Sequence, residues 1–314
     1  MTPTLDREAV IDAPNPLGLA GIEFVEYTTP RPQALGQVLE QMGFRPVARH
    51  RSREVTRYRQ GDMNVIVNAH GLPPGTDEAP QLAALCLRVR DAAAAWRRVV
   101  GLGAWPVPVN VQPMELHIPG IHGVGSSRIF FVDRWNEAPK TAPAPSAPQG
   151  GAPALEAARR AGDFCIYDVD FIPIPTVDPE VPATEGLHWF GVVQYVGVGR
   201  IADWCEFYGA LFGFAALPDE QRFGILPAGR VLRSPCGSFY LQLIEPPPDV
   251  DDAGSEQLQR LAFGAADVPA AVRALRARGV EFVDAAALHP DARGALTQAL
   301  FGGVRFELVH HVQG

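Results

Sequence analysis

Apolar and polar positions along this chain follow a scheme that repeats. In residues 85–107, "LCLRVRDAAAAWRRVVGLGAWPV", an apolar run precedes an Asp-led segment with apolar residues at helical spacing, a glycine and a second apolar run. Residues 261–283, "LAFGAADVPAAVRALRARGVEFV", repeat that order. Each copy therefore predicts a strand, a helix with Asp91 or Asp267 as its N-cap, and another strand.

A second, looser pair of segments follows the same scheme. Residues 22–47 and 190–217 each predict a strand, an amphipathic helix, a Gly-Phe turn and a further strand. Short alternating runs follow these helices, as in "VTRYRQGDMNVIVN" (55–68), where Gly61 marks a hairpin turn. The chain thus predicts four units in the order A, B, A′, B′. Units of about 50 residues are too small to bury a core alone, so we expect them to pair.

A stretch rich in Pro, Ala and Gly separates the two pairs of units. Residues 137–163 cannot form a strand, and we expect them to run over the surface as a linker. The predicted division is an N-terminal extension at 1–18, a first domain at 19–136 and a second domain at 164–314.

Composition limits the cellular compartments and the binding partners that we expect. The net charge of −8 over 314 residues argues against nucleic acid or an anionic membrane as partner, since either favours a basic face. The start, "MTPTLDREAVIDAPNP", lacks the apolar core of a signal peptide, and no apolar run is long enough to span a bilayer. We therefore expect a cytoplasmic protein with reduced thiols. Its four cysteines form no CxxC pair: Cys86, Cys165, Cys205 and Cys236.

Three segments carry a family resemblance. The stretches 21–68, "GIEFVEYTTPRPQALGQVLEQMGFRPVARHRSREVTRYRQGDMNVIVN", 113–134, "PMELHIPGIHGVGSSRIFFVDR", and 166–171, "IYDVDF", resemble the opening domain of bacterial 4-hydroxyphenylpyruvate dioxygenase. The resemblance is looser but traceable from residue 186 to the end. This family belongs to the vicinal oxygen chelate superfamily, which includes glyoxalases, bleomycin resistance proteins and dioxygenases.

The resemblance implies an α+β fold in which four βαβββ modules form two vicinal-oxygen-chelate domains with cupped mixed sheets. It also implies an oxidoreductase of aromatic amino acid catabolism. In such enzymes, two histidines and one glutamate of the C-terminal cup hold Fe(II) and leave open positions for an aromatic 2-oxo acid and O₂.

The iron ligands can be carried over position by position. "RFELV" places Glu307 at the glutamate position, "FGVVQYVG" places Gly191 at the first histidine, and "LQRLAF" places Arg260 at the second. Glycine has no side-chain donor, and a guanidinium has no lone pair to offer and stays charged. Two of the three ligands are thus replaced. We expect no metal in the cup, but an ion pair between Arg260 and Glu307.

Two further positions, Gln298 and His188, bear on the candidate site. Gln298, in "ALTQALF", matches a family glutamine near the metal, so it joins Gly191, Arg260 and Glu307 in the predicted ligand-binding set. His188 precedes Gly191 by three residues, which on a regular strand turns it to the other face. Whether a register shift brings His188 into a metal site stays open.

The N-terminal cup offers no replacement metal site. Its equivalent positions are Glu23, Ala84 and Phe130, which supply one donor in three. This pattern resembles the vestigial first domain of bacterial family members, and we expect it to carry no metal.

Three functional hypotheses remain. In the first, the protein is metal-free and binds a small anionic or aromatic ligand, for example a 2-oxo acid, in the C-terminal cup, with Arg260 as the anion anchor. In the second, it is a metal-independent enzyme in which Glu307 is the general base and Arg260 stabilises an oxyanion. In the third, it is an Fe(II) dioxygenase of aromatic 2-oxo acids. Exposed sheet edges would allow a homodimer, but the sequence does not fix the oligomeric state.

Overall fold

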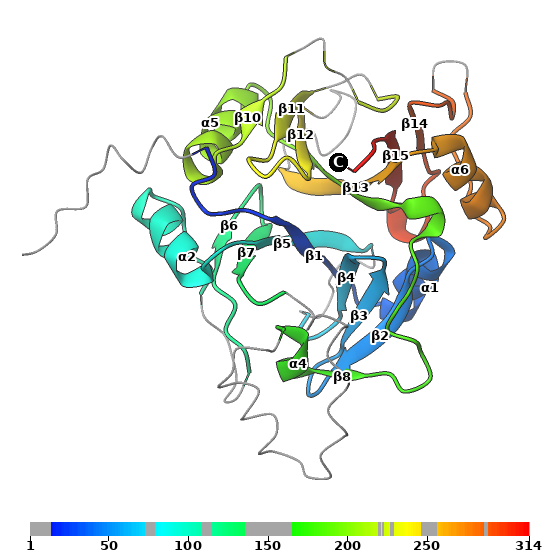
Figure 1. Ribbon diagram of the computed structural model, residues 1–314, viewed down its shortest axis with the longest axis horizontal. Coiled ribbons are helices and arrows are strands. Elements are labelled where there is room, and N and C mark those ends of the chain that lie inside the picture. Colours follow the sequence, from blue (N-terminus) through cyan, green and yellow to red (C-terminus); the bar gives the residue numbers. More distant parts are fainter. Residues whose placement is uncertain are drawn as a thin grey trace, which may run out of the picture.

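The computed structural model describes most of the two predicted domains (Figure 1). The described residues are 14–72, 79–108, 115–135, 165–218, 221, 223–226, 229–245, 256–285 and 288–313. The predicted linker and most of the predicted N-terminal extension lie outside these residues. Among the described residues, no helix is both long and apolar enough to cross a membrane.

The first two units form an N-terminal cup, as predicted. Its elements are β1 (Gly21–Thr28), α1 (Pro32–Gln41), β2 (Arg45–His50), β3 (Val55–Gln60), β4 (Met63–Asn68), β5 (Gln81–Arg88), α2 (Ala92–Gly101), β6 (Gly120–His122) and β7 (Arg128–Val132). Strand β1 pairs in parallel with β4 and antiparallel with β5, and β5 pairs in parallel with β7. The sheet is therefore mixed.

The last two units repeat this arrangement as a C-terminal cup. Its elements are β9 (His188–Tyr195), α5 (Ile201–Phe212), β10 (Ala215–Ala216), β11 (Arg230–Arg233), β12 (Tyr240–Ile244), β13 (Gln257–Ala265), α6 (Val268–Arg276), β14 (Gly294–Leu296) and β15 (Phe306–His310). Strand β9 pairs in parallel with β12 and antiparallel with β13, and β13 pairs in parallel with β15. The fourfold repeat that the sequence predicted is confirmed.

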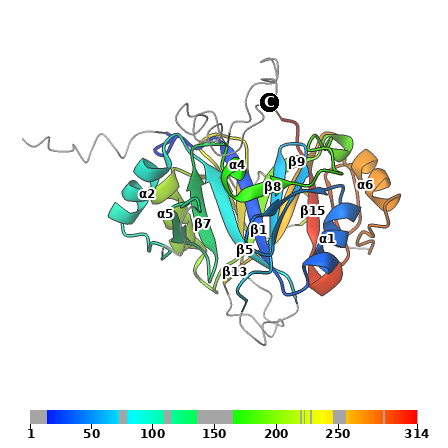
Figure 2. The same ribbon diagram turned by 90° about the horizontal axis from the view of Figure 1, so that it is seen from below.

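The two cups share one hydrophobic core. Their sheets join where Leu258 of β13 pairs with Leu82 of β5. Helices α2 and α5 lie together on one side of the sheets, and α1 and α6 lie on the other (Figure 2). Aromatic rings from the two halves meet in this core, with ring centroids 6.0 Å apart for Phe44 and Phe263. Each cup keeps its own concave face on the other side of its sheet.

Sequence signals at the helix ends are confirmed. The side chain of Asp91 accepts a hydrogen bond from the Ala94 backbone N–H at 2.7 Å, and Asp267 accepts one from Ala270 at 2.8 Å. Such bonds satisfy backbone donors that a helix N-terminus leaves unpaired. Gly213, with φ of 80°, ends α5 in the left-handed conformation that glycine tolerates best.

The second domain does not begin at residue 164 as predicted. The described residues from Cys165 onward form α4 (Tyr167–Asp170) and β8 (Phe171–Pro173), and β8 pairs with β2 of the N-terminal cup. The motif "IYDVDF" packs there because its apolar side chains fill the concave face of that cup. The C-terminal half of the fold therefore starts after β8, at the short 3₁₀ helix η2 (Thr184–Gly186).

Candidate functional site

The candidate site lies on the concave face of the C-terminal cup, where three neighbouring strands bring the sequence-predicted positions together. Gly191 of β9 pairs with Ala262 of β13, and Ala262 pairs with Glu307 of β15. These residues form one row across the sheet. Arg260 lies two residues from Ala262 on the same strand, so its side chain points to the same face.

Arg260 and Glu307 form the ion pair that the sequence predicts. The guanidinium Nε donates to Glu307 Oε2 at 3.0 Å, and Nη1 donates to Gln259 Oε1 at 2.7 Å. The two charged side chains are only 6% and 2% exposed. Burial raises the pKa of the Glu307 carboxyl, while the neighbouring Arg260 opposes that rise. The arginine thus stabilises the charge of a carboxylate that would be costly to bury alone.

Gly191 is a glycine for a steric reason. A Cβ at this position would lie 1.9 Å from the carbonyl oxygen of Tyr240 on the adjacent strand β12. Strand β9 carries a bulge here, since the register moves from Gly191 opposite Ala262 to Trp189 opposite Phe263, and Phe190 is left between them. A histidine at this position would force one of the two strands to move.

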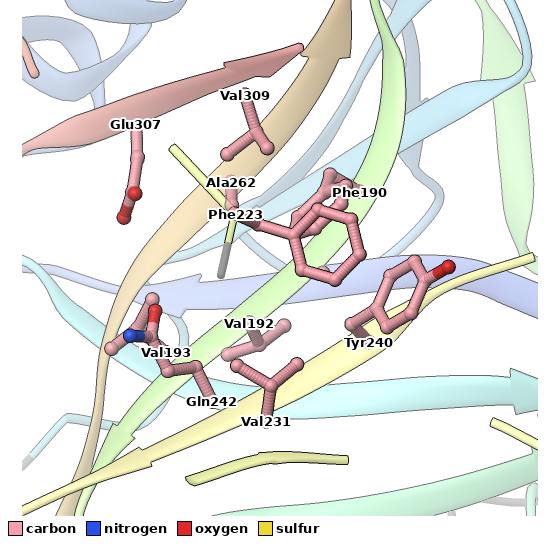
Figure 3. Close-up of a pocket in the computed structure, with 11 residues that line it drawn as sticks. Phe190, Val192, Val193, Phe223, Val231, Tyr240, Gln242, Ala262, Glu307 and Val309 are labelled. Carbon is pink, nitrogen blue, oxygen red and sulfur yellow. The ribbon is translucent and has the colours of Figure 1, made fainter. Parts of the chain in front are cut away.

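Aromatic rings occupy most of the cup. Phe190 and Tyr240 stack with centroids 4.8 Å apart, and Phe223 packs against them at 5.1 and 4.9 Å. The space left for the centre of a water-sized sphere is about 10 Å³, roughly enough for one water molecule. In Figure 3, the polar ends of Glu307 and Gln242 lie on the side of the cup away from the ring of Tyr240. The cup is therefore apolar at one end and polar at the other.

Two of the predicted ligand-binding residues do not reach this space. The Arg260 guanidinium is directed to Glu307 and Gln259 and is not among the residues that line the cup, so the geometry does not support an anion anchor there. Gln298 is exposed and also lies outside the lining. It follows the end of β14, and its backbone N–H donates to the Glu281 carbonyl at 2.8 Å.

A pair of histidines at the rim of the cup was missed. His188 Nε2 lies 3.0 Å from His311 Nδ1, and His188 Nδ1 lies 3.1 Å from the Gly186 carbonyl oxygen. We expected His188 to face away from the cup, but the bulge at Phe190 breaks the regular alternation. One residue of the sequence fits this contact. Position 264 is a glycine, and a Cβ there would lie 2.3 Å from His188 Nε2. Burial lowers the pKa of both histidines.

The N-terminal cup is filled by protein side chains. Glu23 is buried and pairs with Arg88, whose Nε lies 2.6 Å from Glu23 Oε2. Arg57 lies over the ring of Tyr167, 3.5 Å from its centroid, and donates to Asn64 Oδ1 at 2.9 Å. The only metal-donor side chain among the three equivalent positions is thus held by an arginine.

The residues at the C-terminal positions do not offer the donor set of a two-histidine, one-carboxylate iron centre. Gly191 has no side chain and no room for one, and Arg260 directs a cationic donor at Glu307. His188 and His311 do not complete the set either, since the described residues contain no group of three or more His, Cys, Asp or Glu side chains placed to hold a metal ion. No reaction step through iron follows from this geometry.

Paired βαβββ modules with cupped mixed sheets define a glyoxalase-type protein of two domains. Comparison with known proteins supports this classification. The model described as "Hydroxyphenylpyruvate dioxygenase, HPPD, N-terminal" matches residues 13–172, and the glyoxalase/bleomycin resistance protein/dioxygenase superfamily model matches residues 186–307. The chain belongs to the 4-hydroxyphenylpyruvate dioxygenase family.

Individual relatives support this assignment. The chain is 34% identical over 205 residues to a 4-hydroxyphenylpyruvate dioxygenase from Pseudomonas sp. (strain P.J. 874), covering 64% of this chain and 50% of that protein. It is 30% identical to hemolysin VllY of Vibrio vulnificus over 87% of this chain and 74% of that one. Among solved structures, a xylose isomerase-like TIM barrel/4-hydroxyphenylpyruvate dioxygenase fusion protein is similar, with a TM-score of 0.67 and 25% identity. That similarity covers 96% of this chain and 51% of the fusion protein. The chain therefore spans about half the length of the first relative and of this structure.

Proposed function

We propose that this protein is a 4-hydroxyphenylpyruvate dioxygenase-like protein that has no iron-dependent dioxygenase activity and binds a small aromatic ligand in its C-terminal cup. The observation that carries the proposal is the ion pair between Arg260 and Glu307, which occupies the place where the family holds its metal. An iron ion there would compete with a buried guanidinium for the same carboxylate. The stacked rings of Phe190 and Tyr240 support an aromatic ligand rather than a purely polar one.

Metal loading tests the first half of this proposal. The purified protein is incubated with Fe(II) without oxygen, passed through a desalting column and analysed for iron. We expect far less than one equivalent, in the wild type and in Glu307→Ala alike. One tightly bound equivalent that is lost in Glu307→Ala would overturn the proposal and would favour a retained dioxygenase of aromatic 2-oxo acids.

A metal-independent enzyme is the second candidate, because a buried carboxylate lines the cup. Burial raises the pKa of Glu307, which moves it toward the range useful to a general base. Exchange of the α-protons of an aromatic 2-oxo acid in D₂O, followed by NMR, tests this chemistry. Exchange that depends on Glu307 supports the enzyme, and exchange at the buffer rate excludes it for that substrate.

A further inference from the structure

The charge that faces the cup is negative. Glu307 and Gln242 line the space, whereas the Arg260 guanidinium is turned to Glu307 and Gln259 and is not among the described residues that line it. Arg260 binds Oε2 of Glu307, and the other oxygen, Oε1, lies toward Gly224, where a Cβ would come within 2.8 Å of it. A molecule in this space thus meets the Glu307 carboxylate at the polar end (Figure 3).

The apolar end of the cup already contains a ring that a ligand could replace. Phe190 and Tyr240 belong to strands β9 and β12, but Phe223 comes from the segment 223–226, which lies outside the strands. Because only about 10 Å³ is open, a second ring cannot enter while Phe223 is in place. A flat ligand ring would keep the contacts with Phe190 and Tyr240, so the exchange would cost little apolar burial.

Electrostatics then selects the class of ligand. A ligand carboxylate at the polar end would face the Glu307 carboxylate in a poorly solvated space, where like charges repel strongly. An ammonium or hydroxyl group would instead donate a hydrogen bond to Glu307, and a cation would also be attracted to the ring faces of Phe190 and Tyr240.

We infer that the ligand of the C-terminal cup is an aromatic molecule that carries a hydrogen-bond donor and no negative charge, and that its ring takes the place of Phe223. This inference rests on the proposed function, namely that the cup binds an aromatic ligand. It differs from an aromatic 2-oxo acid, whose carboxylate would meet Glu307 and no cation among the described residues that line the cup.

Three probes with one ring and opposite charges test the inference. These are 2-phenylethylamine, 2-phenylethanol and phenylacetate, titrated into the full chain while the methyl signals of Val193, Val231 and Val309 are followed by NMR. In Phe223→Ala, we expect the amine to bind at least about tenfold more tightly than in the wild type. We expect phenylacetate to remain at least about tenfold weaker than the amine. The matched control is Phe301→Ala. The Phe301 ring lies outside the cup, with its centroid 5.2 Å from the Arg31 guanidinium, so this change should leave the affinity for all three probes unaltered.

A second variant tests the role of charge. In Phe223→Ala with Arg260→Met and Glu307→Gln, both buried charges are removed together, so neither is left unpaired. This variant should then bind the amine no more tightly than phenylacetate.

The outcomes separate the inference from the proposed function. If phenylacetate binds the cup as tightly as the amine, the inferred ligand class is wrong and the proposed function stands. If no probe moves the three valine signals even in Phe223→Ala, the cup is not an aromatic site, and both the proposed function and the inference are overturned.

Discussion

Arg260 Nε lies 3.0 Å from Glu307 Oε2 across the parallel strands β13 and β15, with both side chains buried. Removing either partner leaves an uncompensated buried charge. We therefore expect Arg260→Met or Glu307→Gln alone to lower the free energy of unfolding by about 3–5 kcal/mol. The double variant should lose less than either single variant, because no charge is stranded. Urea denaturation of the four proteins measures this coupling.

An exposed pair provides the control for this cycle. Arg293 and Asp291 are bonded at 3.0 Å, but Arg293 is 73% exposed, so solvent screens the interaction. The same mutant cycle on that pair should give a coupling energy of about 1 kcal/mol or less. If the losses at Arg260 and Glu307 are additive, the two residues do not act as one unit and our description of the site fails.

Gly191 should resist substitution. Gly191→Ala places a methyl group 1.9 Å from the Tyr240 carbonyl oxygen, and we expect a loss of about 1–3 kcal/mol or more in stability. Gly101→Ala is the matched control, because nothing lies within 4 Å of the added atom at the end of α2, and a small gain of about 0.5–1 kcal/mol is expected. Equal effects of the two changes on the thermal midpoint would contradict the steric role of Gly191.

This position shows what the sequence could and could not reveal about the site. Motif matching assigned Gly191, Arg260 and Glu307 to one sheet face from residue spacing, and the pairing of β9, β13 and β15 makes the three positions neighbours. It could not reveal the bulge at Phe190, because a bulge adds one unpaired residue without a distinctive composition. The pairing of His188 with His311 and the clash at Gly191 both follow from that bulge.

The fold was more predictable than the site for a physical reason. Four copies of one hydrophobic pattern specify the same unit four times, and caps such as Asp91 and Asp267 mark the helix starts locally. In contrast, the burial of "IYDVDF" in the N-terminal cup depends on contacts with strands more than 100 residues earlier in the chain. Local pattern does not contain that information, so the predicted boundary at residue 164 was wrong.

The ring of Tyr167 should be important for the N-terminal cup. It is buried and lies 3.5 Å under the Arg57 guanidinium. Tyr167→Ala should lower the free energy of unfolding by about 3–5 kcal/mol, through lost burial and the lost cation–π contact. Tyr167→Phe keeps the ring and should cost much less. If the two variants are equally unstable in urea denaturation, the hydroxyl rather than the ring is what matters.

The histidine pair predicts a loss of stability in acid. Burial lowers the pKa of both His188 and His311 below the ordinary value, and the His188 ring, 3.0 Å away, lowers the pKa of His311 further. The unfolded chain therefore binds these protons first, at a pH of about 6.5. The contribution of the pair to stability is fully present above that pH and is lost as the pH falls through the lowered pKa values. Replacing either histidine with glutamine should flatten this acid limb of a plot of unfolding free energy against pH. His310→Gln should flatten it only slightly, since His310 is the smallest of the three causes that lower the pKa of His311. An acid limb that is equally steep in wild type, His188→Gln and His311→Gln would show that other groups govern acid stability.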